Sequence, residues 1–174
     1  MSKRAFAVAA HPDDIEFQMA GTLILLRRAG YEIHYLNLAN GSCGTAELSV
    51  DEIVDIRRQE AQAAAAYMGA VYHESLVDDL AIFYEAPLLA RVAAVMRAVA
   101  PEILLVQSPQ DYMEDHQNAA RLAVSAAFTR GMRNFETVPP TAPVSQPVHV
   151  RPSSSRGPAS TLRPSMSPRP SATP

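Results

Sequence analysis

The chain has 174 residues, 48% of them hydrophobic, and a formal net charge of −3 at pH 7. This length fits one domain with a real core, and no apolar run is long enough to span a bilayer. Residues 1–136 hold all 18 acidic residues but only 11 of the 15 basic ones, and such an acidic body is a poor partner for nucleic acid.

Strand-like and helix-like segments alternate along most of the chain. Short apolar runs predict strands, and apolar residues at helical spacing predict helices. In chain order, the predicted strands are Arg4–Ala10, Tyr31–Ala39, Val71–Leu76 and Glu102–Val106. The predicted helices are Ile15–Arg28, Val50–Met68, Ala86–Val99 and Asp115–Phe128. This alternation predicts an α/β, Rossmann-like three-layer fold with a mostly parallel sheet.

The composition changes near the end of the chain. Ten of the 14 prolines lie in residues 139–174, and residues 137–174 contain four arginines and no acid. We therefore predict a domain over residues 1–147 and a disordered Pro/Ser/Arg-rich tail over residues 148–174. A Pro-rich ligand for SH3-like partners is the alternative for this tail.

The single cysteine bears on the redox state of the cellular compartment in which the protein works. Cys43 has no partner for an intrachain disulfide, so we expect a reducing compartment and a cytoplasmic protein. The sequence leaves the oligomeric state open, a homo-oligomer included.

A histidine and two carboxylates directly follow the first predicted strand, where open α/β sheets place their ligand crevice. His11 and Asp14 offer one nitrogen and one oxygen ligand for a divalent metal, and Asp13 could act as a base. Pro12 stiffens the turn between them. The alternative is a strand-to-helix turn in which Asp13 or Asp14 only caps the following helix.

A second histidine follows the fourth predicted strand. The loop that begins at Gln107 ends with Asp115 and His116, and it should open on the same edge of the sheet as His11. His116 could complete a His/Asp/His triad, and three protein ligands plus water are typical of a catalytic zinc site. Iron suits the same ligands. Alternatively, His116 is a first-turn helix residue beside Asp115.

Four motifs stand out along the chain: Ala10–Glu16, the loop Asn40-Gly41 with Gly44, the helix Ile56-Arg57-Arg58-Gln59-Glu60-Ala61, and Asp115-His116. Together they resemble the PIG-L/LmbE family of zinc-dependent N-deacetylases. The resemblance extends from about residue 4 to residue 147, and family members usually continue further, so the C-terminal part of the fold is expected to be incomplete.

The resemblance implies hydrolysis of an N-acetyl group on an amino sugar or a related small N-acyl substrate. His11, Asp14 and His116 would hold zinc, and Asp13 would be the general base. Metal-bound water and a nearby carboxylate fit this chemistry, since the carboxylate can take the proton of the water and pass it to the departing amine.

Two further residues acquire roles from the resemblance. Arg57 resembles the substrate-contacting arginine of the family, and the alternative is a surface arginine paired with a helix neighbour such as Glu60. Asp79 would line the sugar pocket, and the alternative is a solvated turn.

One residue departs from the family pattern. The family often has a histidine that helps to stabilise the oxyanion at the position of Met113, and a thioether donates no hydrogen bond. Tyr112 is a candidate substitute. Met113 and the unusual tail therefore leave a second possibility, a catalytically impaired remnant that binds metal or sugar.

Overall fold

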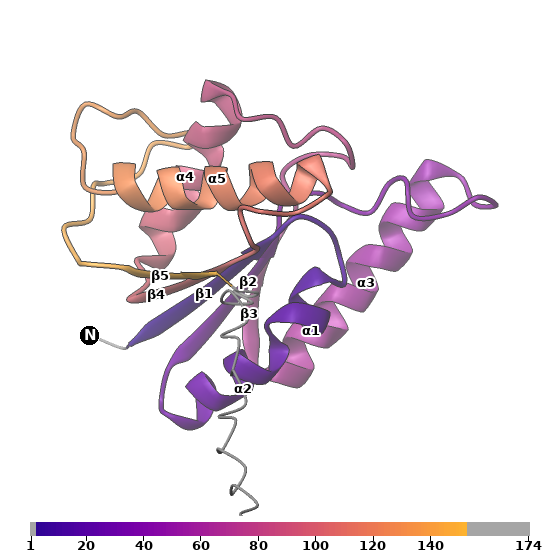
Figure 1. Ribbon diagram of the computed structural model, residues 1–174, viewed down its shortest axis with the longest axis horizontal. Coiled ribbons are helices and arrows are strands. Elements are labelled where there is room, and N and C mark those ends of the chain that lie inside the picture. Colours follow the sequence, from indigo (N-terminus) through magenta and orange to yellow (C-terminus); the bar gives the residue numbers. More distant parts are fainter. Residues whose placement is uncertain (1–2, 153–174) are drawn as a thin grey trace, which may run out of the picture.

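The structure, a computed structural model, describes residues 3–152. Within this range, five parallel strands form one sheet in the order β3-β2-β1-β4-β5 (Figure 1). The strands are β1 (Arg4–Ala9), β2 (Glu32–Asn37), β3 (Ala70–His73), β4 (Ile103–Val106) and β5 (His149–Pro152). The helices are α1 (Asp14–Gln18), α2 (Ala20–Arg28), α3 (Val50–Met68), α4 (Ala86–Val99) and α5 (Glu114–Thr129).

Helices cover both faces of the sheet (Figure 1). Ala5, Ala7 and Ala9 of β1 pack with residues of α1, α2 and α3, whereas Phe6 and Val8 pack with residues of α4 and α5. A strand that is buried on both faces needs apolar side chains at every position, which explains the continuous apolar run of β1. The predicted three-layer α/β fold with a parallel sheet is confirmed.

Helix α3 has sequence signals at both ends. The side chain of Ser49 accepts a hydrogen bond from the backbone N–H of Glu52, and the carboxylate of Glu52 accepts one from the N–H of Ser49. This reciprocal capping box satisfies two backbone donors. At the other end Gly69 adopts φ 64°, a left-handed conformation that glycine takes without steric cost.

Two local expectations needed correction. The helix predicted over Ile15–Arg28 is divided into α1 and α2 by a bend at Met19, whose φ of −126° leaves the helical range. The tail predicted over residues 148–174 begins with a strand, because His149–Pro152 pairs in parallel with β4. The remainder of that tail, residues 153–174, lies outside the described residues.

The sheet order determines where the functional loops emerge. Strand β1 lies between β2 and β4, and its last pairs with β4 include Val8↔Val106. The chain segments that leave β1 and β4 therefore start side by side at the carboxyl edge of the sheet. None of the helices within residues 3–152 combines the length and apolar character that crossing a bilayer requires.

Candidate metal centre

The turn after β1 presents His11 and Asp14 at the carboxyl edge of the sheet. Oδ2 of Asp14 accepts a hydrogen bond from the backbone N–H of His11 at 2.8 Å, which closes the turn. Asp13 adopts φ 123°, a conformation that a residue with a side chain rarely takes. Strained backbone of this kind concentrates at functional sites, because it aims neighbouring side chains at the cost of local stability.

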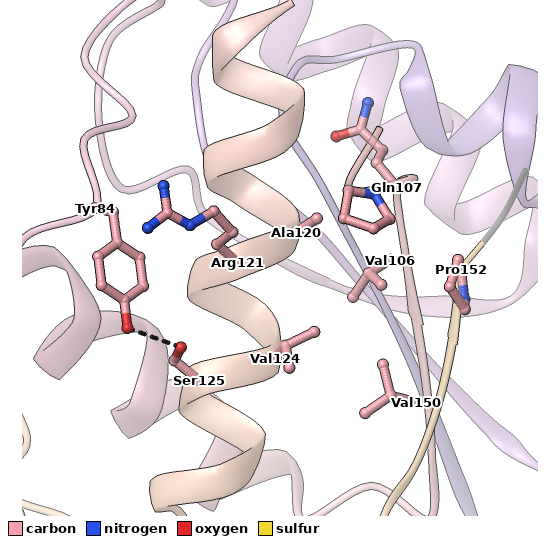
Figure 2. Close-up of a pocket in the computed structure, with 10 residues that line it drawn as sticks. Tyr84, Val106, Gln107, Ala120, Arg121, Val124, Ser125, Val150 and Pro152 are labelled. Carbon is pink, nitrogen blue, oxygen red and sulfur yellow. Dashed lines mark hydrogen bonds between the residues drawn. The ribbon is translucent and has the colours of Figure 1, made fainter. Parts of the chain in front are cut away.

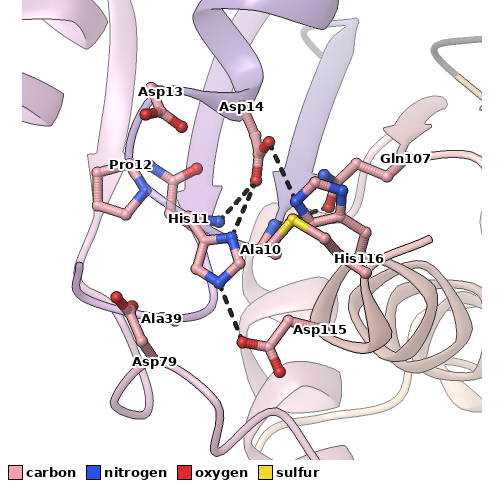
Figure 3. Close-up of polar contacts among 12 residues, drawn as sticks. Ala10, His11, Pro12, Asp13, Asp14, Ala39, Asp79, Gln107, Asp115 and His116 are labelled. Carbon is pink, nitrogen blue, oxygen red and sulfur yellow. Dashed lines mark hydrogen bonds and ion pairs between the residues drawn. The ribbon is translucent and has the colours of Figure 1, made fainter. Parts of the chain in front are cut away.

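The first turn of α5 brings His116 to the same place (Figure 3). Nε2 of His116 lies 3.4 Å from Oδ1 of Asp14, and Nδ1 of His11 lies 3.5 Å from Oδ2 of Asp14. Ligand atoms of the three residues lie within 4.8 Å of one another, so His11, Asp14 and His116 could hold a metal ion. The structure thus brings together all three residues that the sequence pattern put forward as ligands.

Each histidine turns its other ring nitrogen toward a carboxylate. Nε2 of His11 lies 3.0 Å from Oδ2 of Asp115, and Nδ1 of His116 lies 3.1 Å from Oδ2 of Asp111. Metal-binding histidines are commonly oriented in this way, because the outer carboxylate fixes the tautomer and the angle of the ring. The sequence pattern predicted this task for neither aspartate, although both lie in the same short segment as His116.

The charges around His11 favour a cation. Burial lowers the pKa of His11, but the carboxylates of Asp14 and Asp115 outweigh this effect and raise that pKa to about 9. For Asp14, burial raises the pKa, and contacts with His11 and the charge of His116 lower it below its ordinary value. A buried, ionised carboxylate between two imidazoles is a donor set that suits zinc, iron and similar divalent ions.

Asp13 and Arg57 form an ion pair beside the triad. Nη2 of Arg57 lies 2.8 Å from Oδ2 of Asp13, and the same nitrogen donates to the carbonyl oxygen of Pro12. Arg57 also contacts Glu60 at 2.7 Å, which is one of the pairings considered from the sequence. The carboxylate that we predict as the base and the arginine that we predict as a substrate contact therefore touch each other.

A glycine allows Arg57 to lie across the neighbouring loop. A Cβ at Gly41 would stand 2.8 Å from Cγ of Arg57, and the φ of Gly41 is +82°. Both facts restrict this position to glycine. The glycine-containing loop that supported the family resemblance thus makes room for the aliphatic part of Arg57.

Asp79 lies at the site, but its carboxylate binds the chain itself. Its two oxygens accept hydrogen bonds from the backbone N–H groups of Gly41 and Cys43, at 2.8 and 2.9 Å. The N–H of Asp79 in turn donates to Oγ of Ser42. Asp79 therefore fastens the loop over residues 41–43, and its predicted contact with substrate stays a prediction.

These residues surround one cleft of about 450 Å³. Met113 lies in its wall, and Tyr112 is 91% exposed at its rim with its ring centroid 6.5 Å from that of His116. The ring of Tyr112 is thus near His116, and a role of its hydroxyl in place of the histidine stays a prediction. The cleft is lined by His11, Pro12, Asp13, Asp14, Gly41, Cys43, Gly44, Arg57, Asp79, Leu80, Tyr112, Met113 and His116.

A second hollow of about 380 Å³ lies between α5 and the β4–β5 edge (Figure 2). In it, the hydroxyl of Tyr84 lies 2.9 Å from Oγ of Ser125, and the guanidinium of Arg121 stands 4.6 Å from the centroid of the Tyr84 ring. No residue of the triad lines it, so it is distinct from the cleft at the candidate metal centre.

A parallel sheet covered on both faces, with a His/Asp/His group at its carboxyl edge, defines an α/β protein whose site could hold a metal ion. The model of the PIG-L family, described as GlcNAc-PI de-N-acetylase, matches residues 6–127, and the chain belongs to this family. The resemblance inferred from the sequence motifs is confirmed.

The relatives differ in the reactions that their names describe. The chain is 32% identical over 153 residues to 4-oxalmesaconate hydratase of Pseudomonas putida, a match that covers 82% of this chain and 59% of that enzyme. It is 30% identical over 139 residues to diacetylchitobiose deacetylase of Thermococcus kodakarensis, covering 76% and 52%. Among solved structures, N,N'-diacetylchitobiose deacetylase from Pyrococcus horikoshii matches with a TM-score of 0.72 and 26% identity, covering 77% of this chain and 52% of that one. The chain thus spans between about half and six tenths of the length of these relatives.

Proposed function

We propose that the protein is a metal-dependent hydrolase that removes an N-acetyl group from an amino sugar or a similar small N-acyl compound. The observation that carries the proposal is the convergence of His11, Asp14 and His116 in one cleft, with the carboxylate of Asp13 beside them. Relatives whose names describe deacetylation of diacetylchitobiose support the substrate class.

The donor set fits zinc, with iron as the other candidate. Bound zinc would lower the pKa of a coordinated water to about 7 and polarise the acyl oxygen. His11, Asp14 and His116 would hold the ion, while the hydrogen bond to Asp115 would keep the His11 ring oriented, and the carboxylate of Asp111 lies 3.1 Å from the other nitrogen of His116. We also propose a cytoplasmic setting, on the basis of the lone Cys43.

Asp13 would move the proton. Its carboxylate would accept a proton from the attacking water and deliver it to the departing nitrogen, so that amide and water become acetate and free amine. The ion pair with Arg57 holds this carboxylate at the edge of the cleft. A substrate that contacts Arg57 would meet Asp13 at the same time.

A hydratase is the second candidate. The hydratase from Pseudomonas putida is 32% identical to this chain, and Met113 stands where the family resemblance leads us to expect an oxyanion-stabilising histidine. Addition of water to a carbon–carbon double bond of an unsaturated acid uses the same two elements, a metal-bound water and a base. It creates no amine that must be protonated.

The test measures metal content and two product assays on the purified chain. We expect close to one zinc or iron per chain, and release of acetate from N-acetylglucosamine or diacetylchitobiose that His116→Ala abolishes. His149→Ala, which alters an exposed histidine of β5, is the matched control and should change neither value. Loss of the ultraviolet absorbance of a conjugated unsaturated acid, without acetate release, would select the hydratase. A chain that holds metal but turns over neither substrate would be the impaired remnant.

A further inference from the structure

A buried amide at the end of β4 has no task in the chemistry proposed above. Gln107 follows the last residue of β4 and is 0% exposed. Glutamine is seldom buried so completely, because its amide needs hydrogen-bond partners away from water. Figure 3 draws its side chain together with the three candidate ligands.

The amide oxygen of Gln107 has a defined partner. The backbone N–H of Ala10 donates to Oε1 of Gln107 at 2.9 Å, across 97 positions of the chain. The N–H group can only donate, so this bond also identifies which end of the amide is the oxygen. The amide nitrogen of Gln107 makes no hydrogen bond to any residue within 3–152.

This bond takes the place of a backbone hydrogen bond between β1 and β4. The pairing of β1 with β4 ends at Val8↔Val106, and the chain after Val106 is no longer a strand. On the β2 side, by contrast, the backbone ladder continues to the carbonyl oxygen of Ala10, which accepts from Ala39. Without the Gln107 side chain, the N–H of Ala10 would be buried on the β4 side with no acceptor.

We propose that Gln107 is a positioning residue for the metal site. Its side chain fastens the backbone that leads into His11 to the segment that leads to His116. The next N–H, that of His11, is bound by Asp14, so side chains bind two consecutive backbone donors just ahead of the ligands. The inference rests on the proposed function, because it assigns Gln107 the placing of the two halves of that metal site relative to each other.

The effect should be visible in metal affinity. Residues outside the ligand set that orient ligands typically contribute 10- to 100-fold to metal affinity. Gln107→Met keeps the length of the side chain and removes the oxygen that Ala10 needs. Gln107→Glu keeps an oxygen at that position and should rescue the bond. Leu104→Val trims a buried side chain on the same strand without touching the site, and serves as the control for lost stability.

The experiment is a competition titration of the full chain with zinc against a chromophoric chelator, with urea unfolding of each variant in parallel. We expect affinity to fall roughly 10- to 100-fold in Gln107→Met and to stay near or above the wild-type value in Gln107→Glu and Leu104→Val. Wild-type affinity in Gln107→Met, or an equal loss in Leu104→Val, would overturn the role of Gln107 and leave the metal site standing. Absence of zinc binding by the wild type would overturn the metal site itself, and the role of Gln107 with it.

Discussion

Nε2 of His11 lies 3.0 Å from Oδ2 of Asp115, although the two residues are 104 positions apart. The same aspartate oxygen accepts the backbone N–H of Leu80 at 2.8 Å. Asp115 therefore joins three segments of the chain: the turn after β1, the loop that contains Leu80 and the first turn of α5. Its position explains how the His11 ring can present Nδ1 toward Asp14 in a fixed orientation.

We predict that Asp115→Asn weakens zinc binding about 10-fold or more, because an amide orients and polarises the His11 ring less strongly than a carboxylate. Isothermal titration with zinc at neutral pH measures the change. Glu114→Gln is the control, since Glu114 precedes Asp115 in the same helical turn and is exposed. Equal zinc affinity in wild type and Asp115→Asn would show that His11 does not depend on this contact.

The variant Asp13→Asn tests whether Asp13 is the general base. Removal of a general base typically lowers turnover roughly 10²- to 10⁴-fold, so acetate release should fall by that amount while the zinc content stays unchanged. Asparagine is chosen because it tolerates the positive φ of this position better than most residues, which preserves the turn.

The matched control for this variant is Asp51→Asn, which changes an exposed acid in the first turn of α3. Turnover by Asp13→Asn above about a tenth of the wild-type rate would contradict the assignment of Asp13 as the base. Loss of zinc from the variant would instead point to a role of Asp13 in holding the ion.

Much of the fold could be predicted because burial dictates the sequence of its central elements. The boundaries of α3 and α4 match the sequence pattern, since each has a regular apolar face and a defined start or stop signal. Strand β5 has no such signal: His149–Pro152 contains only one strongly apolar residue, and it is a strand because its backbone pairs with β4. Periodicity cannot anticipate a strand of this kind.

The convergence of His11, Asp14 and His116 could also be predicted, because neighbouring parallel strands end at the same edge of the sheet. The contacts around these residues could not. The pairing of Asp13 with Arg57 depends on the unusual φ of Asp13, and the hydrogen bonds of Asp79 depend on the path of two loops. Such contacts are set by backbone geometry that a pattern of residue types does not contain.

A pair of histidines away from the site should make the free energy of unfolding depend on pH. Nδ1 of His34 lies 2.9 Å from Nε2 of His73, and Nε2 of His34 lies 2.8 Å from Glu32. Burial, and in second place the neighbouring His34, lowers the pKa of His73 to about 4. The unfolded chain takes up a proton at this histidine near pH 6.5, whereas the folded chain does so only near pH 4.

The contribution of His73 to stability is therefore present above about pH 6.5 and is lost as the pH falls toward 4. We predict that the fall in the free energy of unfolding between pH 7.5 and pH 5 is smaller in His73→Gln, by on the order of 1 kcal/mol, since partial exposure reduces the effect. Urea unfolding at both pH values measures it. His149→Gln, at an exposed histidine, should keep the wild-type fall, and an identical fall in His73→Gln would contradict the prediction.

A buried arginine of α4 holds the segment that follows α5. Arg97 is 5% exposed and has no carboxylate partner within residues 3–152; its guanidinium instead donates to backbone carbonyl oxygens. A guanidinium has five donors in a fixed planar arrangement, and here it serves as a common anchor for a loop that has little secondary structure. The acceptors are the carbonyl oxygens of Thr129, Arg130, Met132, Phe135 and Thr141.

We predict that Arg97→Met lowers the free energy of unfolding by about 3 kcal/mol, because it leaves five carbonyl oxygens, most of them partly buried, without this donor while adding little apolar contact. Urea unfolding followed by circular dichroism measures the loss, and Arg91→Met on the same helix is the control, with an expected change within about 0.5 kcal/mol. The candidate metal centre lies at the other end of α5, so zinc affinity of the folded Arg97→Met variant should stay at the wild-type value. A loss of zinc affinity together with stability would show that the segment anchored by Arg97 supports the site as well as the fold.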